Sequence, residues 1–249
     1  MEPFEIDQTV WLIDTGLYRP DRRTLALADL HLGYEEAMRQ AGVMLPETRF
    51  EDLLGRLNGV FSALDVSSKT PLNELILNGD LRHDFGPLNA AEWRELNAFF
   101  QEALPFCRRI VVVEGNHDPT LSAFARRFSR VEVVACWQQE GWLYTHGDRV
   151  PELPSGVITI VIGHEHPALS LKDPVTGRRE RYKAFLQGRF AERALWVLPS
   201  CNALLQGTDL TKEGVLSPFL AEGVWQGCLA YARDDQGRIY PFGPLNRLI

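Results

Sequence analysis

Five short polar motifs contain the residues that could do chemistry. Four of them carry histidine, namely ADLHLG at 28–33, GNHD at 115–118, HGD at 146–148 and GHEH at 163–166, and the fifth is NGD at 78–80. They supply seven candidate metal ligands with carboxylate, amide and imidazole donors: Asp29, His31, Asp80, Asn116, His146, His164 and His166. This mixture suits Mn²⁺, Fe²⁺ or Zn²⁺ better than Ca²⁺, which prefers oxygen ligands alone.

The number of donors predicts how many metal ions the site holds. Seven donors are too many for one tetrahedral zinc ion but are typical of two adjacent metal ions that share a bridging carboxylate. The sequence therefore predicts a binuclear metal centre. The alternative is a set of turn and capping residues that share no site.

The elements that would position these motifs are strands. Runs of apolar residues predict buried strands at Thr24–Ala28, Glu74–Asn78 and Arg109–Glu114. Amphipathic helices are predicted between them, from Pro46 to Leu64 and from Trp93 to Leu104. Because the ends of neighbouring parallel strands converge on one crevice, we expect the motifs to meet there.

The second half of the chain is rich in strands. Further strands are predicted at 131–134, 141–145, 157–162, 181–190 and 194–198, with a hairpin over 228–241. We therefore predict an α/β fold, a four-layer α/β/β/α sandwich of two mixed sheets. The metal site would lie at the carboxyl ends of the strands, within one domain over residues 1–249.

Composition and hydropathy bound the class of protein. The chain has 249 residues, 45% of them hydrophobic and 24% charged, which is typical of a folded globular protein. Its longest aliphatic runs are far shorter than the roughly 18 residues that a membrane span needs, and its start lacks a basic signal region. Four cysteines without a CxxC pair suit reduced thiols. We expect a cytoplasmic protein that does not cross a membrane.

The charge balance bears on nucleic-acid binding. A net charge of −7 argues against a protein that coats nucleic acid through its overall field. Between Lys172 and Arg193, however, seven basic residues stand against three acidic ones. This stretch could follow a nucleic-acid backbone, or it could be the solvated face of a hairpin.

The motifs also carry a family resemblance. Their order, DxH, GD, GNHD, H and GHxH, resembles the signature of the calcineurin-like metallophosphoesterase superfamily over about residues 24–170. More narrowly, DLHLGYEEA, LNGDLRH, IGHEHPAL, YKAFLQG and LPSCNALLQGTD resemble a prokaryotic branch that includes phosphoesterases associated with DNA ligase and repair helicases. With the tail included, this closer resemblance covers nearly the whole chain.

The resemblance implies roles for individual residues. It puts one metal ion on Asp29, His31, Asp80 and His166, and the other on Asp80, Asn116, His146 and His164. Asp80 would bridge the two ions, and a hydroxide held between them would attack phosphorus in line. His117 corresponds to the general acid that protonates the leaving oxygen, and Asp118 could orient His117 or raise its pKa. The alternative for His117 and Asp118 is a helix start.

Two further residues could bind substrate. His83 is placed similarly to a histidine that helps position substrate in the double-strand-break repair nuclease of the same superfamily. The alternative for His83 is a surface loop. Tyr34, just past the first motif, could flank the site, although a helix start explains it as well.

We therefore expect a metal-dependent phosphoesterase with two divalent ions, Mn²⁺ being favoured and Fe, Zn or Ni remaining open. Within that class we favour a phosphodiesterase or nuclease acting on DNA, with DNA ligase or a helicase as a partner. One alternative is a phosphohydrolase for cyclic nucleotides or phosphomonoesters. The other is a protein-interaction module that has kept the fold and lost turnover. The oligomeric state is left open.

Overall fold

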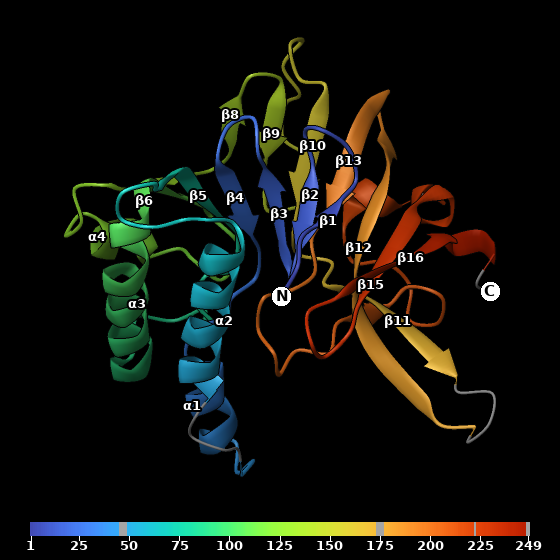
Figure 1. Ribbon diagram of the computed structural model, residues 1–249. Helices are drawn as coiled ribbons and strands as arrows, with labels where there is room; N and C mark the ends of the chain where they lie inside the picture. The colour runs from blue at the N-terminus through green and yellow to red at the C-terminus, as the bar shows by residue number, and fades with distance from the viewer. Residues whose placement is uncertain (45–48, 173–176, 222, 248–249) are drawn as a thin grey trace.

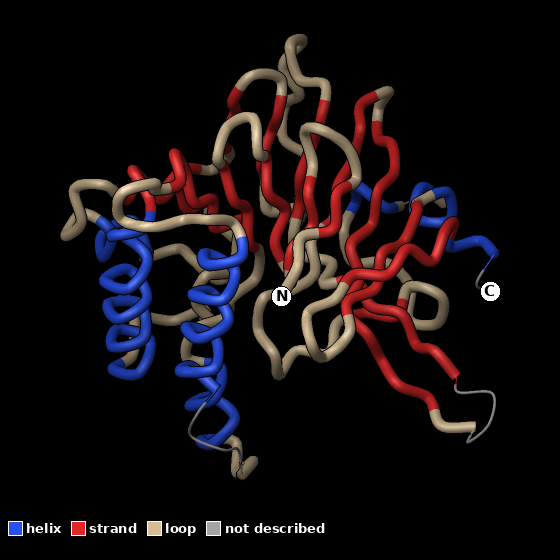
Figure 2. Tube along the Cα trace, in the orientation of Figure 1, coloured by secondary structure: helices blue, strands red, loops and turns tan. Residues whose placement is uncertain are grey.

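Two β-sheets pack face to face in the computed structural model, which describes residues 1–44, 49–172, 177–221 and 223–247. Four α-helices accompany the first sheet, and in Figure 1 the two longest lie together on one side of the molecule. Figure 2 shows strands, loops and a few short helical segments on the opposite side. The predicted α/β sandwich of two mixed sheets is confirmed.

The first sheet contains seven strands in the order of the chain: β1 (Phe4–Glu5), β2 (Trp11–Ile13), β3 (Gly16–Arg19), β4 (Thr24–Leu27), β5 (Leu72–Asn78), β6 (Cys107–Val113) and β7 (Val131–Val134). Strands β1 to β4 are antiparallel, whereas β4 to β7 are parallel. The carboxyl ends of β4, β5 and β6 therefore lie side by side at one edge. Strands β4 to β7 were predicted within a few residues, and β1 and β3 were not predicted.

The helices of the first sheet are α1 (Tyr34–Gln40), α2 (Arg49–Ala63), α3 (Ala90–Ala103) and α4 (Leu121–Ala125). The predicted start of the second helix at Pro46 lies outside the described residues. Helix α3 begins with a capping box, in which the Asn89 side chain accepts the backbone N–H of Glu92 and the Glu92 side chain accepts that of Asn89. This cap fixes where the preceding loop, which carries His83, meets the helix.

Alternation along the parallel strands explains the layers. Leu25, Leu75 and Ile110 face the helices, whereas their neighbours Ala26 and Ile76 face the second sheet. Both faces of these strands are buried, so they read as continuous apolar runs rather than alternating ones. The first sheet is therefore an internal layer, and the polar residues at its carboxyl edge follow strands that are packed on both faces.

The second sheet is mixed and has a main path of seven strands: β14 (Thr208–Asp209), β11 (Pro167–Lys172), β12 (Arg179–Phe190), β13 (Arg193–Val197), β10 (Thr159–Ile162), β9 (Trp142–Tyr144) and β8 (Trp137–Gln139). Strand β15 (Leu229–Arg233) pairs with β12 and with β16 (Ile239–Pro244), which forms the predicted hairpin. Strands β9, β10 and β13 are parallel, so β9 and β10 end at the same edge.

The outer face of the second sheet is covered by short 3-10 helices at Pro218–Leu220 and Val224–Gly227, and Phe219 of the first of these is fully buried in the core. In the described part of the chain, these short helices take the place of α-helices in the fourth layer. Strands β11 and β12 extend away from the body of the molecule (Figure 1). None of the described helices has the length and apolar character needed to span a membrane.

Candidate metal centre and active site

The polar motifs follow strands that end at one edge of the sandwich. Asp29 and His31 follow β4, Asp80 follows β5, and Asn116 and His117 follow β6 in the first sheet. His146 follows β9, and His164 and His166 follow β10 in the second sheet. Residues separated by more than one hundred positions are thereby brought together, as the parallel topology predicts.

The candidate ligands form two compact groups. Asp29, His31 and His166 make up the first group, and Asp80, His146 and His164 make up the second. In each group, one ligand atom from every residue lies within 4.8 Å of the others. His166 Nε2 is 3.4 Å from Asp29 Oδ2 in the first group, and His146 Nε2 is 3.4 Å from Asp80 Oδ2 in the second. These separations are those of atoms arranged around a common centre.

Asp80 lies between the two groups. Its Oδ2 atom is 3.8 Å from His31 Nε2 of the first group and 3.4 Å from His146 Nε2 of its own. Asn116 joins the second group through Oδ1, which is 2.9 Å from His146 Nε2. The structure thus brings all seven candidate ligands together, in the grouping that the resemblance implies. Their role as metal ligands stays a prediction.

The donor atoms of the first group fit a divalent cation. Asp29 Oδ1, His31 Nε2 and His166 Nε2 are buried atoms without a hydrogen-bond partner. A buried polar atom left unsatisfied costs about 1–3 kcal/mol, so three in one group need an explanation. A divalent cation would satisfy all three atoms at once, and carboxylate and imidazole are suitable ligands for it.

Burial and charge act differently on the individual ligands. Burial lowers the pKa of His31 to about 3, so its ring is neutral at neutral pH. Burial alone would raise the pKa of Asp80, but its hydrogen bond to His146 and the charges of the surrounding histidines hold it well below its usual range. Burial alone would lower the pKa of His146, but its hydrogen bond to Asp80 and the charges of Asp29 and Asp80 raise it to about 9, so a bound cation would displace a proton from this ring. Neutral imidazole and ionised carboxylate are the forms that bind metal.

The backbone at the site is unusual. Five candidate ligands have left-handed φ angles between 42° and 61°: Asp29, His31, Asp80, His164 and His166. Non-glycine residues seldom adopt this conformation, although Asp and His do so more readily than most. Two glycines allow the close packing around these turns, since a Cβ atom on Gly79 would overlap His146 and one on Gly115 would overlap Asp80.

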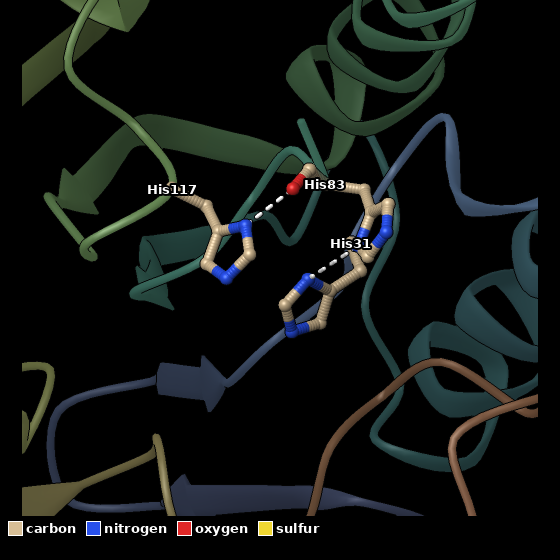
Figure 3. A group of neighbouring side chains, drawn as sticks. All are labelled: His31, His83 and His117. Atoms are coloured by element: carbon tan, nitrogen blue, oxygen red, sulfur yellow. Dashed lines mark hydrogen bonds between the residues drawn. The ribbon is translucent and has the colours of Figure 1, made fainter. Parts of the chain in front are cut away.

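His117 presents one ring nitrogen to the two groups. Its Nδ1 donates a hydrogen bond to the backbone carbonyl of His83 (Figure 3), and its backbone N–H donates to Asp80 Oδ1 at 3.0 Å. Its Nε2 lies 3.8 Å from Asp80 Oδ2. This orientation leaves Nε2 free to exchange a proton with a group bound at the metal centre.

The carboxylate of Asp118 bonds to backbone N–H groups rather than to the His117 ring. This fully buried carboxylate accepts three backbone N–H bonds, from Leu81, Arg82 and Gly115, at 3.0–3.1 Å. The His83 carbonyl holds His117 at Nδ1, so any effect of Asp118 on His117 is exerted through the backbone, and its catalytic role stays a prediction. Asp118 instead ties the loop after β5 to the loop after β6.

His83 and Tyr34 both lie at the site. His83 Nδ1 is 3.5 Å from His31 Nδ1, and its ring stacks on that of His117 with centroids 5.7 Å apart. Figure 3 shows the rings of His31, His83 and His117 grouped together. Tyr34 begins α1 and meets His83 edge-on at 4.7 Å, so it both starts a helix and flanks the site. His83 is half-buried here rather than part of a remote surface loop.

The basic stretch of β12 and its neighbours is largely used within the protein. Arg181 bonds to Glu213 and to the Gly207 carbonyl, and Arg189 pairs with Glu192. Lys183 and Arg193 bond to backbone carbonyls. At least these four of the seven basic side chains are therefore engaged within the protein.

A clamp from the segment after β13 holds the loop that carries Asp29 and His31, and no role was predicted for it. Ser200 Oγ donates to the Asp29 carbonyl at 2.7 Å. Asn202 Nδ2 donates to the carbonyls of Leu30 and His31 at 3.1 and 3.3 Å. These bonds support the left-handed turn that carries Asp29 and His31. The only signal in the sequence was the LPSCNALLQGTD segment, which the resemblance singled out without a role.

The clamp is itself anchored by two cations. Lys183 Nζ donates to the carbonyls of Ser200 and Asn202, both at 2.7 Å. Arg56 of α2 donates to the Cys201 carbonyl at 3.0 Å and pairs with the buried carboxylate of Asp14. The clamp therefore links the loop of Asp29 and His31 to both sheets and to α2.

Comparison with known proteins adds a family and a fold. A family model described as calcineurin-like phosphoesterase matches residues 22–187, more than half of the chain. No curated protein matches the sequence. The crystal structure of the Pseudomonas putida nuclease MPE is similar, with 22% identity, a TM-score of 0.65, and coverage of 97% of this chain and 99% of that one.

Two other solved structures are similar at lower TM-scores. A protein of unknown function, AQ665 from Aquifex aeolicus, has a TM-score of 0.36 and 18% identity, covering 57% of this chain and 78% of its own. A double mutant of Vps29 from Entamoeba histolytica has a TM-score of 0.36 and 10% identity, covering 88% of this chain and 99% of its own.

Proposed function

This chain belongs to the calcineurin-like phosphoesterase family, and from that premise we propose that it is a binuclear, Mn²⁺-dependent phosphodiesterase that cleaves DNA. The observation that carries the proposal is the pair of ligand groups with Asp80 between them and the Nε2 atom of His117 facing them. Two bound divalent ions would supply positive charge to the phosphoryl oxygens and lower the pKa of water.

Each candidate residue would have a separate role in this reaction. The two groups would hold the metal ions, with Asp80 shared between them. His117 would give the Nε2 proton to the leaving oxygen, because its Nδ1 is already held by the His83 carbonyl. His83 and Tyr34 would lie beside the substrate on the side of the leaving group, since their rings adjoin His117 and each other.

DNA as substrate is supported by two observations. The motifs resemble a branch associated with DNA ligase and repair helicases, and the similar solved structure from Pseudomonas putida is a nuclease. On the same ground, we propose DNA ligase or a helicase as a partner. The engaged basic residues of β12 favour the second candidate, a phosphohydrolase for small molecules, because that substrate needs no extended basic surface.

The test compares a phosphodiester with a phosphomonoester. The protein is stripped of metal and reconstituted with Mn²⁺, and hydrolysis of bis-p-nitrophenyl phosphate and of p-nitrophenyl phosphate is measured. We expect hydrolysis to depend on Mn²⁺ and to favour the diester. A preference for the monoester would contradict the nuclease, and no hydrolysis of either would favour the non-catalytic module.

Salt dependence separates the two enzymatic candidates. Binding of DNA releases counterions, so its affinity falls steeply as salt rises. Binding of a cyclic nucleotide depends far less on salt, since few phosphates are neutralised. We expect the apparent KM for single-stranded DNA to rise several-fold between about 50 and 200 mM salt. A flat profile would favour the small-molecule substrate.

A further inference from the structure

Phe85 is an exposed aromatic residue in contact with His117. Its ring centroid lies 3.8 Å from that of the imidazole, with 32° between the planes. Phe85 is nevertheless 64% exposed, the highest exposure of any aromatic residue among the exposed large hydrophobic residues of the described chain. Phe85 therefore contacts His117 through its ring while most of the residue stays open to solvent. A single exposed hydrophobic residue is ordinary in itself; what distinguishes Phe85 is that its exposed ring packs on the candidate general acid, where a ligand would bind.

The position of Phe85 is fixed relative to the leaving group. A general acid must come within about 2.6–3.2 Å of the oxygen that it protonates. The leaving oxygen would therefore lie at His117 Nε2, on a ring that is itself packed against Phe85. In a dinucleotide, the base on the leaving side is joined to that oxygen through a single sugar. That base can reach the open face of Phe85.

We propose that Phe85 stacks against the base of the nucleotide on the leaving-group side of the scissile phosphate. This proposal rests on the proposed function and names the substrate more closely. A base in continuous duplex has both faces covered by its neighbours, so the platform fits an unpaired base. The favoured substrate is therefore single-stranded DNA or a frayed end.

Hydrogen bonds to Glu92 of α3 hold the loop that precedes Phe85. Arg82 and Glu92 are both fully buried and joined by two hydrogen bonds of 3.0 and 3.2 Å. The backbone N–H of Asp84 donates to the same Glu92 carboxylate at 3.0 Å. Phe85 thus follows a residue whose backbone is fixed to α3. A ring presented from a fixed backbone loses little freedom when a base stacks on it.

A second role for Phe85 must be separated from stacking. The ring could act only by shielding His117, which would change the rate for every substrate to the same degree. Stacking instead acts only when a base is present on the leaving side. The two roles are distinguished by removing the base rather than by removing the ring alone.

The experiment uses thymidylyl-thymidine and its two abasic analogues, each lacking one base. kcat/KM is measured with Mn²⁺ for the wild type, Phe85→Leu and Phe85→Trp. We expect the wild type to lose about 5- to 150-fold when the leaving-side base is absent and little when the other is absent. Phe85→Leu should reduce this difference to about twofold, and Phe85→Trp should retain it. Tyr240→Leu removes an exposed aromatic ring elsewhere and serves as the matched control.

An equal dependence on the base in the wild type and in Phe85→Leu would overturn the stacking proposal. The stacking proposal would also be overturned if the wild type hydrolysed bis-p-nitrophenyl phosphate but no dinucleotide. Absence of Mn²⁺-dependent hydrolysis of bis-p-nitrophenyl phosphate by the wild type would overturn the proposed function, and the stacking proposal with it. The failure of stacking alone is thereby distinguished from the failure of the function.

Discussion

The imidazole of His117 donates a hydrogen bond from Nδ1–H to the backbone carbonyl of His83. A carbonyl oxygen can only accept, so this contact fixes which ring nitrogen carries the first proton. Nε2 is left to face Asp80 at 3.8 Å. The ring is therefore oriented by the backbone of the loop after β5, and a change of side chain at position 83 leaves this bond in place.

His117→Ala tests the role of the general acid. We expect kcat for a dinucleotide to fall by about 10²- to 10⁴-fold, because its alkoxide leaving group needs a proton. The loss on bis-p-nitrophenyl phosphate should be much smaller, since p-nitrophenolate leaves without one. Steady-state kinetics on both diesters provide the measurement. Equal losses on the two substrates would show that His117 does not act by proton donation.

Asp80→Asn tests the shared carboxylate. Loss of its charge should lower the rate at least about 100-fold and reduce the number of Mn²⁺ ions retained by the protein. Metal content by atomic absorption and hydrolysis at saturating Mn²⁺ are measured together. Asp7→Asn is the control, because Asp7 accepts hydrogen bonds only in the turn between β1 and β2. Near-normal turnover with two ions bound would contradict the binuclear assignment.

Asn202→Ala tests the clamp on the loop of Asp29 and His31. Residues that hold metal ligands in place typically contribute about 10- to 100-fold to metal affinity. We therefore expect Mn²⁺ affinity, measured by isothermal titration calorimetry, to fall within this range. Asn73→Ala is the control. It removes a similar hydrogen bond, from the Asn73 side-chain amide to the Arg22 carbonyl, near the start of β5 and far from the site, and it should leave the affinity unchanged. The same affinity in both variants would exclude a role for the clamp in metal binding.

Lys183 makes the stability of the protein depend on pH. Burial, together with the nearby charge of Arg56, lowers the pKa of Lys183 to about 7 in the folded protein. In the unfolded chain the pKa is about 10.4. Between these values the unfolded state binds the extra proton, so the free energy of unfolding rises with pH, by up to about 1.4 kcal/mol per unit.

Urea unfolding of the metal-free wild type and of Lys183→Met at pH 6, 7.5 and 9 checks this prediction. Lys183→Met lacks the titrating group, so the difference in stability between the two proteins should change in favour of the wild type as pH rises. Lys183→Met should also lose the two bonds to the Ser200 and Asn202 carbonyls at every pH. A constant difference across this range would show that Lys183 keeps its ordinary pKa.

The sequence pattern was sufficient to predict the parallel strands and the meeting of the polar motifs at one edge, whereas the division of the candidate ligands into two groups was implied by the family resemblance. Continuous apolar runs such as Ile110–Val113 indicate strands buried on both faces, and each is followed by a polar motif. Once the strands are parallel, topology brings Asp29, Asp80 and Asn116 to one edge whatever the loop details. The strand β3 was missed because its sequence, GLYR, contains no run of aliphatic residues of the kind that marks β4 to β6.

The contacts that orient the ligands could not be predicted in the same way. Asp118 and Asn202 act on backbone N–H and carbonyl groups, which every residue has, so no partner residue type marks them. Glu165, between two ligand histidines, accepts the backbone N–H groups of Leu216 and Ser217 from a distant segment. Phe85 is a single aromatic residue in a loop and has no periodicity to reveal it.

The left-handed turns limit how this site can change during evolution. Asp, Asn and His adopt such φ angles more readily than other non-glycine residues, and the same side chains bind divalent metals. An exchange among these three types at Asp29, His31 or His166 can alter metal preference while the loop keeps its shape. A cysteine or a β-branched residue would add about 1–2 kcal/mol of backbone strain at each position. Single substitutions among Asp, Asn and His are therefore compatible with the backbone of these turns, whereas cysteine or a β-branched residue is strained there.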